Sequence, residues 1–221
     1  MKKAKKYLFL SMGFLFLFVL WTASLRFIDV QPIGPEGSSV GFAEMNRFFH
    51  RLTGVHLSLY ILTDWLGLIP VFACMAFAFL GLIQWIKRKS IRKVDAGILL
   101  LGGFYLVVMA AYLFFEYRII NYRPVLLDGR LEASYPSSTT LLTLSVMPTA
   151  MMQLNARIRK PRFRRLTLSA LSAFTVFMLA SRLISGVHWL SDIIGGVLLS
   201  AGLVMLYASL CERTHNNHQC T

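Results

Sequence analysis

The sequence predicts an all-α polytopic membrane protein: a six-transmembrane-helix bundle with a short amphipathic helix between spans 1 and 2. Of the 221 residues, 56% are hydrophobic and only 15% are charged, which is too apolar for a soluble domain of this size. Runs of about twenty apolar residues recur, and this is the length that crosses a bilayer as a helix. We expect the whole chain, 1–221, to form one integral membrane domain.

The apolar runs define the elements in chain order. The first run could be a signal peptide, but it is longer than the usual apolar core of one and no small-x-small cleavage site follows, so a retained span is favoured. A more polar segment contains Phe42 to Leu52, which predicts an amphipathic helix lying on the membrane surface. A short polar tail from Cys211 to Thr221 ends the chain. The six expected spans are 7–25, 57–86, 96–115, 138–154, 166–184 and 189–210.

The distribution of positive charge indicates how the chain lies in the membrane. The net charge of +13 does not point to nucleic acid, because most Lys and Arg residues lie in short clusters between apolar runs. With six spans, the N-terminal tail, the 87–93 loop and the 157–165 loop share one side, and they hold all eight lysines. The positive-inside rule places that side in the cytoplasm. We therefore expect an inner (cytoplasmic) membrane protein with both termini inside, its basic loops touching anionic lipid.

The cysteines indicate neither a disulfide framework nor a metal site. Cys74 lies inside an apolar run, whereas Cys211 and Cys220 lie in the tail. Their spacing matches no metal-ligand pattern, so we expect no metal and no cofactor. Nothing in the sequence indicates an oligomeric state.

Polar residues lie beside apolar runs in three stretches, and these stretches mark a candidate site on the side of the membrane opposite to the basic loops. Ionisable groups at membrane depth are costly and usually functional. His188 and Asp192 are four residues apart, so on a helix the carboxylate can reach the imidazole and fix its tautomer. Arg123 and Arg182 are suited to grip phosphate oxygens in a bidentate manner. The plainer alternative is an interfacial cap, with Arg182 reaching to lipid head groups.

The turn 137–139 offers a second kind of anion contact. Ser137, Ser138 and Thr139 open an expected span, and the N–H groups of a helix N-terminus are natural phosphate donors. Plain N-capping by serine is the alternative.

Three short stretches resemble the signature of the type-2 phosphatidic acid phosphatase superfamily, whose site is shared with vanadium haloperoxidases. The stretch 181–192 matches the Ser-Arg-x5-His-x3-Asp motif at every defined position. Arg123-Pro124 matches the first motif, but its usual Lys is Glu116 here. The second motif, usually Pro-Ser-Gly-His, reads Pro136 to Thr139 and lacks its His. The motif-bearing core covers about 94–210.

The resemblance implies a membrane phosphatase for a lipid phosphate, with His188 as the nucleophile and Asp192 orienting it. Arg123, Arg182, Ser137, Ser138 and Thr139 would hold the phosphate. By the same resemblance, Thr139 cannot supply the proton that the family's His gives to the leaving oxygen, and Glu116 would repel phosphate. Arg118, two residues further on, is an auxiliary candidate that could supply the missing cation.

Two departures from the motifs leave alternatives open. The phosphohistidine could pass its phosphoryl group to an acceptor lipid, or the protein could be a catalytically impaired lipid-phosphate binder. If it is active, the missing acid predicts a preference for lipid diphosphates such as a prenyl diphosphate carrier, because their leaving group is less basic. His50, His56 and Glu116 are the candidates for a replacement acid.

Overall fold

The structure is a computed structural model that describes residues 2–219, with side chains described as far as Thr214. Every regular element in this range is helical, as the sequence predicts. The helices are α1 (Lys2–Ser24), α2 (Ala43–Thr53), α3 (Leu57–Leu66), α4 (Leu68–Arg88), α5 (Ala96–Tyr117), α6 (Ser138–Arg157), α7 (Pro161–Ile184) and α8 (Leu190–Gln219), with 3₁₀ turns η1 (Pro35–Gly37) and η2 (Ile91–Lys93). Cys220 lies outside the described residues.

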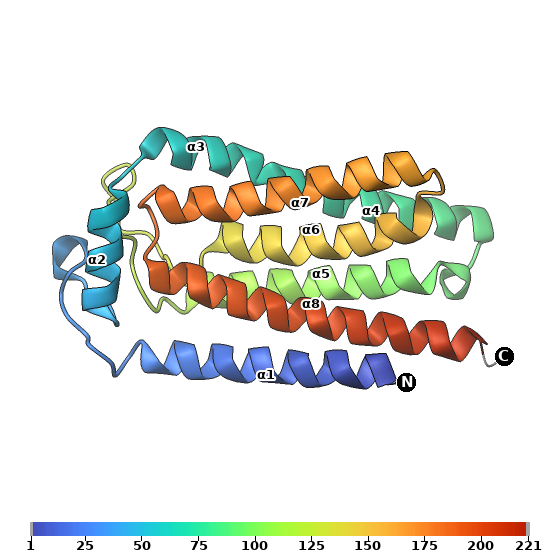
Figure 1. The fold of residues 1–221 in the computed structure, drawn as a ribbon, viewed down its shortest axis with the longest axis horizontal. Helices are drawn as coiled ribbons and strands as arrows, with labels where there is room; N and C mark the ends of the chain where they lie inside the picture. Colours follow the sequence, from blue (N-terminus) through green and yellow to red (C-terminus); the bar gives the residue numbers. More distant parts are fainter. Residues whose placement is uncertain (1, 220–221) are drawn as a thin grey trace.

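The long helices run alongside one another, and both chain termini lie at the same end of the bundle (Figure 1). Helix α6 is central, since it packs against α4, α5, α7 and α8. At the opposite end, α2 lies across the bundle beside the turn from α7 to α8 (Figure 1).

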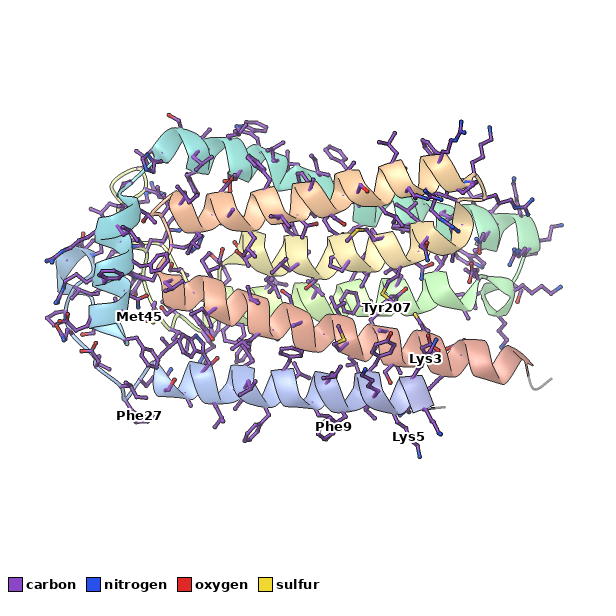
Figure 2. All side chains as sticks on the ribbon, in the orientation of Figure 1. Lys3, Lys5, Phe9, Phe27, Met45 and Tyr207 are labelled. Atoms are coloured by element: carbon purple, nitrogen blue, oxygen red, sulfur yellow. The ribbon has the colours of Figure 1, made fainter. Side chains whose placement is uncertain are left out.

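Five helical stretches are long and apolar enough to cross a membrane: 2–24, 57–88, 96–117, 161–184 and 190–214. Their surfaces carry many exposed apolar side chains; Phe9, for example, points outward from α1 and is 77% exposed (Figure 2). Such a surface suits lipid contact. The protein is therefore a multi-pass membrane protein.

The expected fourth span, α6, is not among the five stretches. Its buried face is rich in hydroxyl groups, which lowers its hydropathy; buried there are Thr139, Thr140, Thr143, Ser145 and Thr149. A central helix surrounded by other helices needs less apolar surface than one that faces lipid. The six-span count thus stays a prediction, with α6 as the helix that decides it.

The expected second span is broken near one end. The chain from Leu57 to Arg88 forms two helices, α3 and α4, that meet at Gly67. Helix α3 packs against α7 rather than continuing α4 as one regular helix (Figure 1). The break leaves Asp64 on the last turn of α3, close to α6 and α7.

Helix α2 is held to the start of α8 by one buried residue. The side-chain amide of Asn46 donates to Ser191 Oγ at 3.0 Å, and Asn46 Oδ1 accepts from the Ser191 backbone N–H at 3.1 Å. From α1, Trp21 Nε1 donates to the Ser191 carbonyl at 3.1 Å. The first turn of α8 is therefore fixed by two other helices. That the apolar side of α2, with Phe42, Met45, Phe48 and Phe49, rests on a membrane stays a prediction.

Candidate active site

His188 lies in the short loop between α7 and α8, at the end of the bundle opposite to the termini. Gly186 shapes this loop with a positive φ of 67°, and an added Cβ there would meet the carbonyl oxygen of Gly54 at 1.9 Å. The loop thus approaches the segment between α2 and α3 so closely that only glycine fits. The side chain of His188, in the same loop, is only 1% exposed.

The hydrogen bonds of His188 determine its tautomer. Arg123 Nη1 lies 3.3 Å from His188 Nε2, and a guanidinium can only donate, so Nε2 must accept. The proton of the neutral ring is then on Nδ1, which donates to Ser134 Oγ at 3.1 Å. The Ser134 hydroxyl in turn donates to Asp192 Oδ2. The lone pair of Nε2 therefore faces the arginine side of the site.

Ser134 stands between the two residues that the sequence pairs directly. His188 Nδ1 and Asp192 Oδ2 are 4.0 Å apart, which is too long for a hydrogen bond. The helical spacing argument does not hold here, because α8 begins at Leu190 and His188 precedes it. Sequence reasoning missed Ser134, since a single serine before the 135–139 stretch carries no distinguishing signal.

The carboxylate of Asp192 is completely buried and fixed by three donors. Besides Ser134, its Oδ1 accepts from Asn121 Nδ2 and its Oδ2 from the Trp189 backbone N–H, both at 3.0 Å. Asn121 opens the Asn121 to Pro124 stretch, so the first and third motif stretches meet at this carboxylate. A carboxylate with this many donors is held rigidly.

Arg182, on the last turns of α7, is 1% exposed and reaches across to α3 and α6. Its guanidinium donates to Thr139 Oγ1, to Thr63 Oγ1 at 3.3 Å and to Asp64 Oδ1 at 3.4 Å. Asp64 is therefore its counter-ion, and sequence reasoning gave this residue no role. Nothing in the sequence marks a lone Asp in an apolar span as the partner of an arginine more than a hundred residues away.

Both arginines carry a buried Nε–H without a hydrogen-bond partner among the described residues. Glu132 Oε2 lies 3.2 Å from Arg123 Nε, but the N–H direction misses it, so this is an ion pair by distance only. Buried donors are rarely left unpaired in proteins. The unpaired Nε–H groups of Arg123, which contacts the imidazole, and of Arg182 suit an anionic ligand.

The start of α6 adds backbone donors. No side chain caps this helix, and its first free N–H groups belong to Ser138 and its neighbours. Ser138 lines an open pocket together with Arg123, Ser134, His188 and Glu116. The Ser137 N–H is already used, because it donates to the Asp192 carbonyl at 3.2 Å. An anion in this pocket would meet a helix N-terminus.

Charge and burial together keep His188 neutral. Burial lowers its pKa well below the ordinary 6.5, and the nearby positive charges of Arg123 and Arg182 lower the pKa further. The ring is therefore unprotonated at neutral pH, and its Nε2 lone pair accepts from Arg123.

The structure places the candidates for an auxiliary cation and for a replacement acid at different distances from the pocket. Glu116 lines the pocket with His188, whereas Arg118 is exposed and is not among the lining residues. His50 packs against Trp189 with ring centroids 5.5 Å apart, and burial lowers its pKa. His56 Nε2 bonds to the Thr53 carbonyl at 2.9 Å.

A larger, mainly apolar groove opens beside the pocket. It has a volume of about 870 Å³ and lies between α4, α5 and α6. Ser138, Thr139 and Asp64 line one part of it, and apolar residues such as Phe77 and Ile98 line the rest. Ser138 lines both the pocket and the groove, so the two adjoin.

Fold and site together define a helical membrane protein in which an imidazole and one arginine, Arg123, line a small pocket. Arg182 does not line this pocket, but its guanidinium lies over the same Tyr60 ring as that of Arg123. The profile of the PAP2 superfamily matches residues 103–215, and the chain belongs to this superfamily. The crystal structure of the first transmembrane PAP2 type phosphatidylglycerolphosphate phosphatase from Bacillus subtilis is similar in fold, with a TM-score of 0.62. The two chains are 15% identical, and the match covers 93% of this chain and 97% of that one. No curated protein sequence matches the chain.

Proposed function

We propose that the protein is a membrane phosphatase that hydrolyses a lipid phosphate through a phosphohistidine on His188. The observation that carries this proposal is the arrangement of the ring: Nε2 faces the guanidinium of Arg123, while Nδ1 is engaged by Ser134. A nucleophile held by a third group in this way is the usual mark of covalent catalysis. Membership of the PAP2 superfamily supports the same reaction class.

The reaction proceeds in two displacements. When a phosphate binds, the Arg123 N–H that bonds to Nε2 turns to a phosphate oxygen and frees the Nε2 lone pair. This lone pair attacks phosphorus, the bond from phosphorus to the leaving oxygen breaks, and that oxygen keeps the electron pair. The imidazolium that forms retains its Nδ1 proton and is stabilised through Ser134 by the Asp192 carboxylate. Water then attacks phosphorus, and the electron pair of the P–N bond returns to Nε2. Both protons of the water leave with inorganic phosphate, so His188 is neutral again.

The protein's contribution to phosphoryl transfer is mainly positioning and charge stabilisation. Arg123, Arg182 and the N-terminus of α6 would hold the equatorial oxygens, whose charge grows in the transition state. These groups supply the cationic charge without a metal ion, so we propose a metal-independent reaction. Orthovanadate should then inhibit without added metal, and a chelator should not inhibit.

The adjoining groove supports a lipid as the substrate. A lipid tail could lie along the apolar residues of α4 and α5 while its phosphate reaches the pocket past Ser138. Burial of apolar surface is worth roughly 25 cal/mol per Å², so a long chain contributes strongly to binding.

Within this class we propose a preference for lipid diphosphates. A monoester releases a strongly basic alkoxide, whereas a diphosphate releases a lipid monophosphate whose oxygen is far less basic. General-acid help is typically worth about 10²–10⁴-fold and matters least for good leaving groups. Thr139 stands at the position of the family's acid, and an aliphatic hydroxyl does not give up its proton near neutral pH. Its Oγ1 accepts a hydrogen bond from Arg182.

We further propose that the site faces outward from the cytoplasmic membrane. The lysine clusters belong to the end of the bundle that holds both termini, and Figure 2 shows Lys3 and Lys5 there. Labelling by a membrane-impermeant maleimide tests this in a background without native cysteines. Arg130→Cys should react from outside in intact cells, and Lys89→Cys should react only after permeabilisation.

The central experiment is phosphate release by the purified protein from a panel of lipid monophosphates and diphosphates. His188→Ala should lose activity by about 10⁴-fold or more, because a nucleophile has no substitute. His56→Ala is the control, since its exposed ring bonds only to a neighbouring carbonyl. Adding an acceptor lipid distinguishes phosphoryl transfer from hydrolysis. Binding of the lipids without any turnover would contradict the proposal that the protein is a phosphatase.

A further inference from the structure

Both arginines of the site lie over the ring of one residue on α3. The guanidinium carbon of Arg182 is 4.8 Å from the centroid of the Tyr60 ring, and that of Arg123 is 5.6 Å from the same centroid. Tyr60 precedes the residues matched by the superfamily profile, which begin at 103. An aromatic ring attracts cations through the negative potential of its face.

Two like charges in so small a space need stabilisation when no anion is bound. Arg182 is almost fully buried and Arg123 is 9% exposed, so water screens their repulsion poorly. Their carboxylate partners are far more open, because the side chains of Asp64 and Glu132 are 59% and 44% exposed. Well-hydrated carboxylates stabilise weakly.

Helix α3 presents one face to Arg182. Tyr60, Thr63 and Asp64 have the i, i+3, i+4 spacing of neighbours on a helix surface, and all three contact this guanidinium. The Tyr60 carbonyl accepts from Arg182 Nη1 at 3.5 Å, in addition to the contact of the ring. The backbone and the ring of Tyr60 therefore both contact Arg182.

We propose that Tyr60 is a positioning residue whose ring holds Arg123 and Arg182 in the arrangement that binds phosphate. The inference rests on the proposed function in one respect, namely that the two arginines bind the phosphate group. Without the ring, the two arginine side chains are free to leave this arrangement. Phosphate binding must then order them again, and this entropic cost lowers the affinity. Fixed donors need no such reorganisation at the moment of reaction.

The size of the effect follows from the cation–π contacts. Each is worth a factor of about 2 to 30 in an equilibrium constant, with the larger values at desolvated sites. Two contacts on one ring predict a loss of about tenfold to a hundredfold in phosphate affinity for Tyr60→Leu. Tyr60→Phe keeps the ring and should bind within about threefold of the unchanged protein.

The experiment measures binding of inorganic phosphate by calorimetry and inhibition of phosphate release by orthovanadate, on full-length protein in nanodiscs. Trp65→Leu is the matched control: it makes an aromatic-to-leucine change on the same helix, and Trp65 is 70% exposed. A series of increasingly fluorinated phenylalanines at position 60 keeps the shape of the ring while weakening its negative face. This series stays informative if Tyr60→Leu does not fold.

The expected result is a stepwise loss of phosphate affinity along the fluorinated series, a large loss in Tyr60→Leu and none in Trp65→Leu. Equal affinity across the fluorinated series would overturn the proposal, as would a Tyr60→Phe variant as weak as Tyr60→Leu. Phosphate binding is measured without turnover. A protein that binds phosphate through Tyr60 but releases none from lipids would therefore contradict the proposed function and leave this inference standing.

Discussion

His188 Nε2 accepts a hydrogen bond from Arg123 at 3.3 Å, and this one contact determines how the imidazole is used. Since the guanidinium has only donors, the ring proton must be on Nδ1. A positive charge at hydrogen-bond distance also opposes protonation of Nε2. The atom that faces the anion pocket is thereby kept as a lone pair.

The first prediction concerns the pKa of His188. It should lie below the ordinary 6.5, because burial, Arg123 and Arg182 all disfavour the charged ring. Hydrogen–deuterium exchange at the ring C2, followed by mass spectrometry across pH, reports this pKa without any substrate. Arg123→Gln removes one of the positive charges and should raise it.

The same shift has a consequence for stability. The unfolded chain takes up this proton near pH 6.5, whereas the folded chain resists it. The free energy of unfolding should therefore decrease as the pH falls below about 6.5, until the pH reaches the lowered pKa of the folded state. A His188 exchange midpoint at or above 6.5, unmoved in Arg123→Gln, would contradict both statements.

The second prediction concerns Ser134 as the link between His188 and Asp192. Ser134→Ala breaks both hydrogen bonds and should lower kcat by about 10- to 100-fold, less than His188→Ala, because the nucleophile remains. Asp192→Asn should also cost less than His188→Ala. If Ser134 and Asp192 act as one unit, the double variant should be no worse than the worse single variant.

A matched control exists for Ser134→Ala. Ser145 on α6 is also completely buried, but its hydroxyl has no hydrogen-bond partner among the described residues. Ser145→Ala should leave kcat unchanged, because it removes only an unpaired group. Strictly additive losses in the double variant would mean that Ser134 and Asp192 act on His188 separately.

The third prediction concerns the loop that carries His188. Gly186→Ala places a methyl group 1.9 Å from the Gly54 carbonyl, at a residue whose φ is already positive. Backbone cannot give way as a flexible side chain does, so both thermal stability and phosphate release should decrease. Gly103→Ala, where nothing lies within 4 Å of the added Cβ, should be neutral or slightly stabilising. Equal melting temperatures for the two variants would contradict the close contact.

The spacing of residues along the chain predicts the helices and the motif residues, but it does not predict contacts between distant segments. Apolar runs predict the helices well, because a membrane helix needs about twenty such residues whatever its neighbours are. A motif singles out Arg123, Arg182 and His188 as candidate site residues, and their roles stay predictions. Ser134, Tyr60 and Asp64 could not be singled out, since their importance arises only when distant segments meet. His188 and Asp192 do lie close together, but Ser134 connects them. The reason is local, because the chain becomes helical only after His188.

Helix α6 shows where the prediction of membrane spans from composition reaches its limit. A single apolar run suggested a span at 138–154, but a central helix can bury hydroxyl groups that lipid would not accept. Composition alone cannot distinguish a helix that faces lipid from one inside the bundle, because the burial of α6 depends on which helices surround it.

The last prediction concerns the acid that is absent at Thr139. If no other group protonates the leaving oxygen, the unchanged protein should cleave a lipid diphosphate much faster than phosphatidic acid. Thr139→His restores an imidazole beside the pocket and should then raise monoester turnover more than diphosphate turnover. The reason is that general-acid help, worth about 10²–10⁴-fold, grows with the basicity of the leaving oxygen.

The competing possibility is a replacement acid, and the structure narrows the candidates. Of the three that the sequence suggests, only Glu116 lines the pocket with His188. Glu116→Gln removes this carboxyl group while keeping its shape. If the variant loses monoester turnover far more than diphosphate turnover, Glu116 is the acid. Equal or faster cleavage of phosphatidic acid by the unchanged protein would rule out the diphosphate preference itself.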